Sequence, residues 1–353
     1  MTTLCRILIR CDGSPGVGMG HTVRCLALAD ELRSVHSCEI AFAVREGMEG
    51  IDLIRKHNYR VFTPEKNDMR FDYFSWIMGI IDEYQPWGFI LDIRDDFPLA
   101  LVREIKKRGI KTISIDDISD RRLLADLAFY PPIPQIKRME WAGFKGKLFS
   151  GWEWVLIRPE FSVKKDKPRH LRPVILVTMG GSDPQRMTLT AIQALEMLDA
   201  EFDVKVITGP AFFHHDALLD LLKNARHHYQ VLNNVVNMAD IMRNADIAVA
   251  SFGVTAYELA SQGVVAVFLC LSDDHAESAS SFVQEGMMIS LGNFARISPE
   301  KIADSINDLV SNPTRCKEMS TISIQKVDGN GVKRTAEKIL ESFNSDTSIE
   351  KSG

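Results

Sequence analysis

The sequence predicts an α/β protein built from two domains, each a doubly wound parallel sheet. The chain has 353 residues, which is more than a single hydrophobic core usually organises, so two domains of roughly 150 to 200 residues are expected. Short apolar runs rich in β-branched residues alternate with helical patterns from one end of the chain to the other. This alternation is typical of parallel strands joined by helices that cover both faces of a sheet.

The first domain is expected over residues 1–160. Its predicted strands are CRILIR, CEIAFAV, YRVFT, WGFILD and KTISID, and its predicted helices cover 20–33, 51–57, 72–84 and 98–107. Between 131 and 167 the alternation lapses into a stretch rich in proline, aromatic and basic residues. We therefore expect the chain to cross between the domains within this stretch.

The second domain is expected over residues 161–345, followed by a disordered tail over 346–353. Its predicted strands are PVILVTMGG, FDVKVITG, YQVLNN, DIAVASFG, VVAVFLC and MMISLG, and its predicted helices cover 187–198, 217–225, 239–244, 255–262, 275–285, 298–310 and 331–343. Both halves are Rossmann-like, and open sheets of this kind bind ligands beyond the carboxyl ends of their strands. The two domains should therefore face a shared cleft, with the function in loops that follow strands.

Composition argues against several classes of protein. The net charge of −5 argues against a nucleic-acid partner, which requires an excess of Lys and Arg. No run approaches the ~18 consecutive apolar residues of a membrane span, and the N-terminus lacks a signal-peptide apolar region, so a cytoplasmic protein is expected. The six cysteines form no C-x-x-C pair and are interpreted as reduced thiols. The histidine pairs at 214–215 and 227–228 have no further ligands at metal spacing, so neither a metal nor another cofactor is expected.

A glycine-rich stretch, CDGSPGVGMGHTVRCLALA, follows the first predicted strand and occupies residues 11–29. Its glycines at 13, 16, 18 and 20 do not fit the dinucleotide pattern G-x-G-x-x-G, although they allow backbone to approach a bulky ligand closely. His21 stands in the first turn of the predicted helix, where the helix dipole disfavours the charged imidazolium. A neutral imidazole there could act as a general base, and the alternative is that His21 only packs at the helix start.

The same stretch resembles the N-terminal signature of the hydrolases that act on UDP-2,4-diacetamido-2,4,6-trideoxy-β-L-altropyranose in pseudaminic acid biosynthesis. It equally resembles the related spore-coat polysaccharide proteins, which are similar in fold to the two-domain GT-B glycosyltransferases. The matching residues are Arg10, Asp12, Gly18, Gly20, His21, Arg24, Leu26 and Ala29. Further matches are ISIDDISDR at 113–121, GWEWVLIRPEF at 151–161, VTMGGSDP at 177–184 and the segment 239–262.

This resemblance implies a GT-B-like fold and a catalytic His21. It also implies that the sugar side of the site is formed by Arg10, Asp12, Gly18, Gly20, Arg24, Asp92, Asp274 and His275. Two of these places depart from the family pattern, because Asp274-His275 replaces an Asn-Gln pair and LDIRDD leaves Asp92 without a tyrosine two residues later. The paired acids at 95–96 and 116–117 are interpreted as loop caps or, alternatively, as sugar contacts.

Two loops of the second domain suit a nucleotide. VTMGGSDP ends a strand in Gly180, Gly181, Ser182 and Asp183 before a helix, which is an arrangement that can hold a phosphate through backbone N–H groups. The strand IAVAS delivers Ser251, Gly253 and Thr255 to a helix N-terminus, and Glu258 lies one turn further in, where a carboxylate can accept from a ribose diol. The alternative for Glu258 is a plain helix-surface acid. By resemblance, the backbone near Asn237 and Met238 would contact the base.

Together these features predict a metal-independent hydrolase of a nucleotide-activated amino or deoxy sugar, with UDP as the expected nucleotide. His21 would deprotonate water, which attacks the anomeric carbon while the nucleoside diphosphate leaves. The alternatives are a GT-B glycosyltransferase, in which His21 activates an acceptor hydroxyl, and a non-catalytic protein that binds nucleotide sugars.

Overall fold

A computed structural model describes residues 5–13, 18–64, 71–163, 168, 170–233, 235 and 237–347. The chain divides into two compact units. Unit 1 consists of Met1–Pro131, Arg138–Arg158 and Asn330–Gly353, and unit 2 consists of Pro132–Lys137 and Pro159–Gly329. The chain therefore leaves unit 1 twice and returns to it twice.

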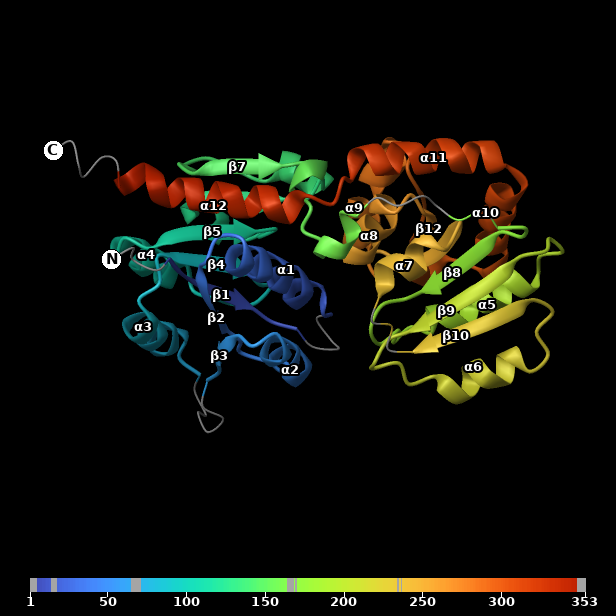
Figure 1. Cartoon of the computed structure of the whole chain (residues 1–353), viewed down its shortest axis with the longest axis horizontal. Coiled ribbons are helices and arrows are strands. Elements are labelled where there is room, and N and C mark those ends of the chain that lie inside the picture. Colours follow the sequence, from blue (N-terminus) through green and yellow to red (C-terminus); the bar gives the residue numbers. More distant parts are fainter. Residues whose placement is uncertain are drawn as a thin grey trace. The chain divides into compact units, whose positions relative to one another are not determined.

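Unit 1 contains one seven-stranded sheet flanked by helices (Figure 1). Its strands are β1 (Arg6–Cys11), β2 (Glu39–Ala43), β3 (Arg60–Phe62), β4 (Gly88–Asp92), β5 (Lys111–Ile115), β6 (Leu127–Tyr130) and β7 (Lys147–Ser150). Its helices are α1 (Gly20–Ser34), α2 (Met48–Lys56), α3 (Tyr73–Tyr84), α4 (Leu99–Lys107) and α12 (Gly331–Thr347), with 3-10 turns at Asp120–Leu124 and Trp152–Trp154. The strand order is β3-β2-β1-β4-β5-β6-β7, and every pairing is parallel.

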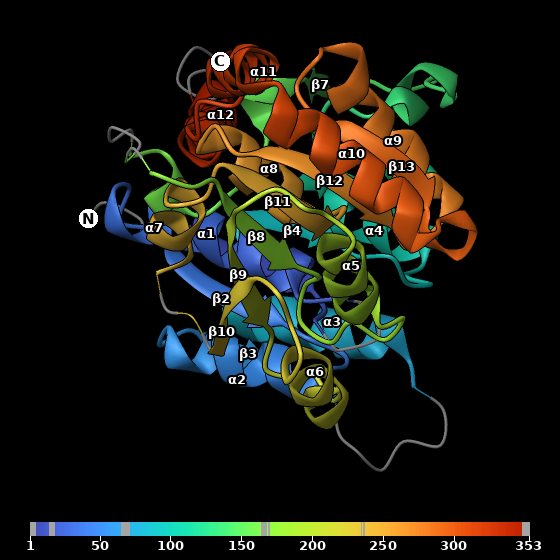
Figure 2. The same cartoon turned by 90° about the vertical axis from the view of Figure 1, so that its right-hand side faces the viewer.

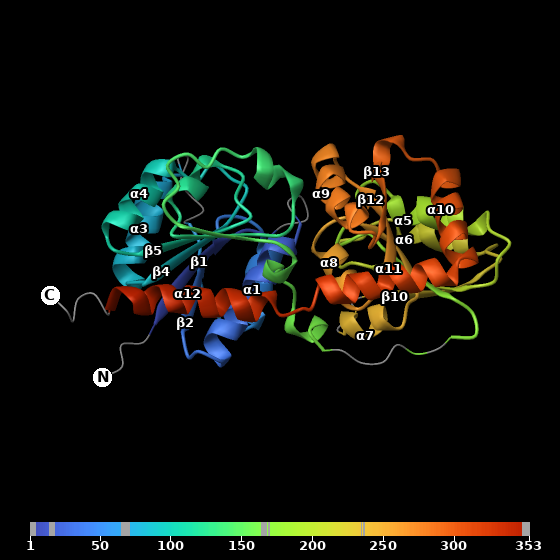
Figure 3. The same ribbon diagram turned by 90° about the horizontal axis from the view of Figure 1, so that it is seen from above.

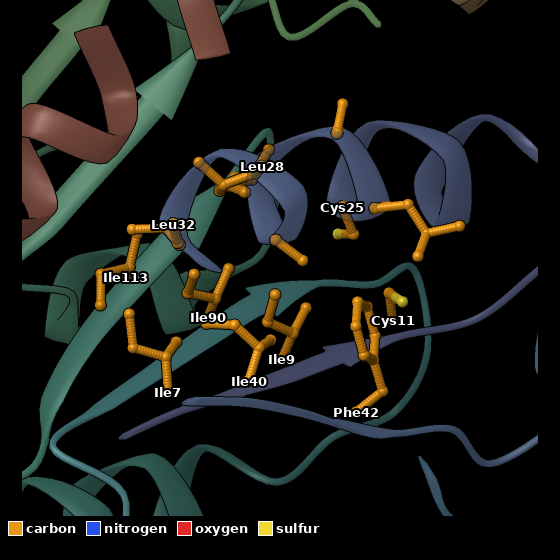
Figure 4. Close-up of a cluster of buried hydrophobic side chains, with 14 of the residues drawn as sticks. Ile7, Ile9, Cys11, Cys25, Leu28, Leu32, Ile40, Phe42, Ile90 and Ile113 are labelled. Carbon is orange, nitrogen blue, oxygen red and sulfur yellow. The ribbon is translucent and has the colours of Figure 1, made fainter. Parts of the chain in front are cut away.

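The sheet of unit 1 is doubly wound because alternate strand residues bury against different helices. In β1, Ile7 and Ile9 pack in a core with α1, α2 and α12, whereas Leu8 packs in a separate core with α3 and α4. Figure 4 shows Leu28 and Leu32 of α1 lying over the strands. Each of these fully buried leucines contributes about 1.5–3 kcal/mol through burial, which fixes the helix that begins at the glycine-rich stretch.

Unit 2 repeats the architecture with six strands. These are β8 (Val174–Thr178), β9 (Asp203–Thr208), β10 (His228–Asn233), β11 (Ile247–Ser251), β12 (Val265–Cys270) and β13 (Ile289–Asn293). Its helices are α5 (Met187–Glu196), α6 (His215–Leu222), α7 (Met238–Arg243), α8 (Val254–Ser261), α9 (Asp273–Gln284), α10 (Pro299–Ser311) and α11 (Pro313–Lys326), with 3-10 turns at Pro159–Phe161 and Phe294–Arg296. A further 3-10 turn, Pro134–Arg138, lies where the chain returns to unit 1.

The strand order in unit 2 is β10-β9-β8-β11-β12-β13, again with parallel pairings throughout. One core contains residues of α5, α6 and α10 together with the strands, and α10 packs beside α5 (Figure 2). Helix α8 packs against β11, β12 and α11.

Each sheet reverses its strand order at one point. The reversal lies between β1 and β4 in unit 1 and between β8 and β11 in unit 2. At such a point the two following loops turn to opposite faces of the sheet, which leaves a crevice beyond the carboxyl ends of the two strands. At the first reversal, the glycine-rich stretch follows β1 and Asp92 is the last residue of β4. At the second, the Gly180 loop follows β8 and the Gly253 loop follows β11.

The α/β fold with two Rossmann-like domains is confirmed, and the shared cleft stays a prediction. The predicted division of the chain differs from the structure in its last part, because Asn330–Gly353 belongs to unit 1 rather than to the second domain. In Figures 1 and 3, α12 is the long red helix that lies with the elements of unit 1, beside α1. The predicted tail over 346–353 starts too early, since α12 continues to Thr347; residues 348–353 lie outside the described ones.

Packing explains why α12 joins unit 1. Its apolar residues Val332, Ala336, Ile339 and Phe343 recur at helical spacing and are buried in the core to which α1 also contributes. The first residue of β4, Gly88, leaves room for this helix, because a Cβ at Gly88 would lie 2.7 Å from the Phe343 ring. Sequence periodicity predicts the helix but not which sheet it covers.

Two strands and one α-helix of the described chain were absent from the prediction, as were the 3-10 turns. The short strand β6 directly precedes a proline pair, and its four residues were not predicted as a strand. Strand β7 is an edge strand whose residues are mostly exposed. Helix α11 buries only Met319 and Ser323, so its sequence carries little apolar periodicity.

Candidate active site

His21 lies in the first turn of α1, beside Asp92 at the end of β4. The distance from His21 Nδ1 to Asp92 Oδ1 is 2.6 Å. An ionised carboxylate can only accept, so Nδ1 carries the hydrogen and the lone pair of a neutral imidazole is on Nε2. No hydrogen-bond partner of Nε2 is found among the described residues, and the His21 side chain is 16% exposed. The imidazole is therefore oriented by Asp92 and can accept a proton at Nε2.

Arg24, one turn further along α1, holds Asp92 in place. Its Nε donates to Asp92 Oδ2 at 2.6 Å and its Nη2 donates to Oδ1 at 2.5 Å. The Cys25 thiol adds a contact to Oδ2 at 3.3 Å. Burial alone would raise the pKa of Asp92, but the charge of Arg24 and the contact with His21 hold that pKa well below its usual range. Asp92 is therefore a fixed, ionised acceptor.

The predicted roles of Asp92 and Arg24 as sugar contacts are not favoured by this arrangement. The Asp92 side chain is fully buried and both of its oxygens are occupied. The Arg24 guanidinium is hydrogen-bonded to Asp92 and also to Asp116, whose Oδ2 accepts from Arg24 Nη1 at 3.3 Å. Both residues instead position His21, and the regular helix spacing of 21, 24 and 25 brings all three side chains to one carboxylate.

A cavity of about 100 Å³ adjoins His21. It lies at the strand reversal between β1 and β4, as expected for an open sheet. Its lining residues are Asp12, His21, Glu46, Asp92, Ile93, Arg94 and Asp95. Four of these, Glu46, Ile93, Arg94 and Asp95, were not among the predicted site residues. Only Asp95 had been considered, as a loop cap or alternatively a sugar contact.

Arg10 was predicted to contact the sugar; this stays a prediction, and the structure shows the Arg10 side chain engaged within the fold. Its side chain is fully buried and its Nη2 donates to Asp12 at 2.7 Å, to the Tyr73 hydroxyl at 2.8 Å and to Asp95 at 2.6 Å. Burial would lower the pKa of Arg10, but hydrogen bonding and charge from Asp12 raise it above its usual value. Arg10 therefore acts as a buried counter-ion that fixes two carboxylates of the cavity wall.

Asp12 lines the cavity as predicted for a sugar-side residue, but it also has a local structural task. Its Oδ1 accepts from the backbone N–H groups of Arg45 at 2.9 Å and Glu46 at 3.2 Å, while Oδ2 accepts from Arg10. These bonds tie the loop after β2 to the end of β1. A sugar contact by Asp12 remains a proposal.

The glycines serve close packing and an unusual backbone conformation. Gly13 has no room for a side chain, because a Cβ there would lie 2.2 Å from the Thr22 hydroxyl of α1. Gly18 has a φ of +88°, which favours glycine, and Gly20 is the first residue of α1. Gly16 lies outside the described residues. Substrate contacts by Gly18 and Gly20 remain proposals.

In unit 2, the two predicted nucleotide loops lie together at the strand reversal. Gly180 has a φ of +80°, and a Cβ on it would lie 3.7 Å from the Ser251 hydroxyl at the end of β11. A Cβ at Gly209 would lie 2.4 Å from the Gly181 carbonyl oxygen, so the loop after β9 also approaches closely. Ser182 lies in the same loop and is partly exposed. The loops after β8, β9 and β11 therefore lie close to one another at this end of the sheet.

Asp183 was predicted to bind the nucleotide, and the structure gives its side chain another task. Its Oδ1 accepts from the Met187 N–H and its Oδ2 from the Thr188 N–H, both at 2.8 Å, so it caps the first turn of α5. The side chain is buried, and this burial raises its pKa above the usual value. Asp183 therefore shapes the loop rather than offering a free carboxylate.

The second loop leads into α8 as predicted. Gly253 is the residue before the helix, Thr255 lies in its first turn, and Glu258 follows one turn later. Glu258 is 4% exposed, which contradicts the alternative of a plain surface acid. Asn237 precedes α7, whose first residue is Met238, and its side-chain oxygen accepts from the Asp240 N–H at 3.1 Å. Contacts of these residues with a nucleotide remain proposals.

Asp274 and His275 lie in the first turn of α9, after Ser272, whose hydroxyl accepts from the His275 N–H at 3.2 Å. Gln135 was not predicted here. Its side-chain amide donates to Asp274 Oδ1 at 3.1 Å and to the Ser278 hydroxyl at 2.9 Å. An amide group thus stands beside Asp274, although it comes from residue 135 rather than from the position where the resembling families carry Asn-Gln.

The remaining acidic pairs divide between the two interpretations. Asp117 is a loop cap whose Oδ1 accepts from the Ser119 N–H at 2.8 Å. Asp95 both caps its loop, by accepting from the Phe97 N–H at 3.1 Å, and lines the cavity.

Within the described part of the chain, no three His, Cys, Asp or Glu side chains gather as metal ligands, and no helix there is long and apolar enough to cross a membrane.

Comparisons with known proteins agree with this architecture. Residues 174–339 match the model of the glycosyltransferase family 28 C-terminal domain. The chain is 28% identical over 294 residues to an uncharacterized protein of Methanocaldococcus jannaschii, which covers 79% of this chain but only 58% of the archaeal protein. It is 23% identical over 335 residues to the spore coat polysaccharide biosynthesis protein SpsG of Bacillus subtilis, covering 92% of this chain and 94% of that protein.

Solved structures show the same fold. MurG of Acinetobacter baumannii superimposes with a TM-score of 0.72 at 17% identity, covering 96% of this chain and 99% of that one. The UDP-GlcNAc 2-epimerase of Neisseria meningitidis, solved with UDP-GlcNAc, gives a TM-score of 0.62 at 13% identity, covering 95% and 100%. The resemblance to spore-coat polysaccharide proteins is confirmed as a distant one, and that to the pseudaminic-pathway hydrolases stays a prediction. The chain thus has a GT-B-like fold of two Rossmann-like domains, and its residues 174–339 are similar to the C-terminal domain of glycosyltransferase family 28.

Proposed function

We propose that this protein hydrolyses a nucleotide-activated amino or deoxy sugar at the anomeric carbon. Unit 1 supplies the base and the sugar-side cavity, and unit 2 binds the nucleoside diphosphate. The observation that carries the proposal is the His21–Asp92 pair, which leaves the lone pair of Nε2 free in a residue that lines a cavity. The expected products are a free sugar and a nucleoside diphosphate, which belong to the biosynthesis of a nonulosonic acid or a surface polysaccharide.

The steps of the reaction balance without a further reactant. Nε2 of His21 takes a proton from water as the water oxygen bonds to the anomeric carbon. The bond between that carbon and the diphosphate oxygen breaks, and its electron pair stays on the diphosphate. The imidazolium then passes its proton to solvent. The N–H groups at the Gly180 loop and at the start of α8 would stabilise the charge of the leaving diphosphate.

The nucleotide assignment rests on the two loops of unit 2 that meet at the β8–β11 reversal. Gly180, Gly181 and Ser182 offer backbone N–H groups, and the α8 N-terminus follows Ser251 and Gly253. UDP is the proposed nucleotide, since the similar Neisseria epimerase was solved with UDP-GlcNAc. Glu258 is proposed to accept from the ribose hydroxyls, and the backbone near Asn237 and Met238 to contact the base.

Glu258→Gln is expected to weaken UDP binding by roughly ten- to a hundredfold, because hydrogen bonds from ribose to a charged acceptor are stronger than those to a neutral one. Glutamine keeps the side-chain shape inside the buried turn of α8. Titration calorimetry with UDP measures the effect, and Glu277→Gln on α9 serves as a control of the same type. Unchanged affinity in Glu258→Gln would remove Glu258 from the nucleotide site.

A glycosyltransferase is the second candidate, because residues 174–339 match a glycosyltransferase domain. In that reaction the same His21 base would activate an acceptor hydroxyl instead of water. Both functions use the same nucleotide sugar, so they differ only in the nucleophile.

Incubation of the purified protein with a panel of UDP-, CMP- and GDP-sugars in the absence of acceptor separates the candidates. Release of free sugar supports the hydrolase. Turnover that appears only when an acceptor alcohol is added would replace it with the transferase, and binding without turnover under either condition would leave only a nucleotide-sugar binding protein.

A further inference from the structure

Arg94 lines the cavity beside His21, although the proposed base does not require it. It stands two residues after Asp92, where the resembling families have a tyrosine. Its side chain is 34% exposed. Nη2 donates to Asp116 Oδ2 at 2.8 Å, and Nη1 donates to the Asp116 backbone carbonyl. No partner of its Nε–H is found among the described residues, so this guanidinium is anchored yet retains a donor.

Asp116 is held in a conformation that is costly for most residues. It directly follows β5 and has a φ of +53°. Non-glycine residues in this region persist only where the surroundings fix them, and here the Asp116 N–H donates to the Phe129 carbonyl at 2.8 Å. Its Oδ2 accepts from both Arg94 and Arg24. One carboxylate oxygen therefore links the Arg24–Asp92–His21 chain to the cavity wall at Arg94.

The charges around the cavity make Arg94 distinctive. The other ionisable lining groups besides His21 are the carboxylates of Asp12, Glu46, Asp92 and Asp95. Ionised carboxylates accept hydrogen bonds and cannot donate them. Their negative charge repels a carbonyl or carboxylate oxygen of a ligand. Of the described lining residues, Arg94 is the cation that can donate to such an oxygen.

We propose that Arg94 is a specificity-determining residue that donates to an sp² oxygen on a ring substituent of the sugar, either an N-acyl carbonyl or a carboxylate. Asp116 is the positioning residue that fixes the guanidinium in the cavity wall. This inference rests on the proposed function, because it requires a nucleotide sugar to occupy the cavity. It adds to that function a rule for which sugars are preferred.

The test uses three ligands that share one nucleotide: UDP-N-acetylglucosamine, UDP-glucuronic acid and UDP-glucose. Binding is measured by calorimetry in a His21→Asn background, so that turnover does not interfere. Arg94→Met should weaken binding of the N-acyl sugar, the uronic acid sugar or both by roughly ten- to a hundredfold, and that of UDP-glucose by less than about threefold. The ligand that loses affinity identifies which oxygen is recognised.

The matched control is Arg60→Met, which removes a guanidinium of unit 1 that is 52% exposed and pairs with Glu83 outside the cavity. It should leave all three affinities unchanged. Equal losses for the three ligands with Arg94→Met, or no loss for any, would overturn the inference while leaving the proposed function intact. Failure of all three ligands and of UDP to bind the parent protein would overturn the proposed function, and this inference with it.

Asp116→Asn tests the positioning role, since asparagine tolerates the same backbone conformation but lacks the charge. It should reduce the preference for the recognised ligand over UDP-glucose. In the Arg94→Met background the same change should reduce that preference no further, because Asp116 acts through Arg94. A purely structural defect would weaken all three ligands together, and independent, additive losses of preference would show that Asp116 acts by another route.

Discussion

His21→Asn is expected to lower kcat by about 10² to 10⁴, which is the usual contribution of a positioned general base. Nucleotide-sugar affinity should stay within a few-fold of the parent protein, because the proposed nucleotide contacts are in unit 2. The physical reason is the loss of Nε2, since the Asp92–Arg24 pair that orients the ring is left in place. Single-turnover kinetics and calorimetry on the same samples measure the two quantities.

The chain offers a matched control in a second histidine–aspartate pair. His57 Nδ1 lies 3.1 Å from Asp30 Oδ2, away from the cavity residues, and the His57 side chain is 38% exposed. His57→Asn should leave kcat unchanged. In ¹⁸O-labelled water the label should enter the released sugar, as attack at the anomeric carbon requires. Label in the nucleotide would mean attack at phosphorus and would contradict the proposed mechanism, and a His21→Asn protein that turns over at the parent rate would show that His21 is a packing residue.

Asp92→Asn is expected to have two large effects. First, kcat should fall by about 10² to 10⁴, because asparagine no longer fixes the tautomer of His21 or stabilises the imidazolium that forms. Second, the free energy of unfolding should fall by about 3 kcal/mol, near the lower end of what breaking a buried ion pair costs. The lower end applies because Arg24, whose side chain is 11% exposed, keeps its contact with Asp116.

The stability effect can be followed in unit 1 by fluorescence. All five tryptophans, at 76, 87, 141, 152 and 154, belong to this unit, so their signal during urea unfolding reports the unit that carries Asp92. Asp126→Asn is the control, since Asp126 is also a paired carboxylate of unit 1 but binds Lys106 and Thr112 away from the cavity. It should leave kcat unchanged. A stable Asp92→Asn protein with normal kcat would contradict the proposed role of Asp92.

The stability difference should also depend on pH. The folded-state pKa of Asp92 is held below its usual value of about 4. A lowered carboxyl pKa contributes stability at and above the unfolded-state pKa, and this contribution is lost as pH falls through the folded-state value. The parent and Asp92→Asn proteins should therefore differ most near neutral pH and approach each other below pH ~4.

The candidate site shows how far residue types lead without a fold. His21 was predicted as the base from its place after the glycines, and in the structure it lines a cavity. Arg10 and Arg24 match the family pattern as strongly as His21 does, yet Arg10 binds the carboxylates of Asp12 and Asp95 and Arg24 binds the buried carboxylate of Asp92. A sequence pattern records that a position is constrained, but it does not separate a residue that touches the ligand from one that holds its neighbour. For Arg94, the only signal in the sequence was that it stands where the resembling families have a tyrosine.

Most helices and strands and the α/β architecture were predictable from the sequence, because the period of apolar residues and the alternation of strands with helices are local properties of the chain; β6, β7 and α11, whose local patterns are weak, were not. Both parallel sheets, the helix that presents His21 and the loops at Gly180 and Gly253 follow from such local patterns. Strand neighbours depend on contacts between distant parts of the chain, and these contacts bring Asp92, 71 residues beyond His21, to the His21 imidazole at the β1–β4 reversal. The position of α12 in unit 1 was also not predictable, because the apolar face of a helix does not specify the sheet on which it packs. That choice depends on side-chain fit, as between Phe343 and Gly88.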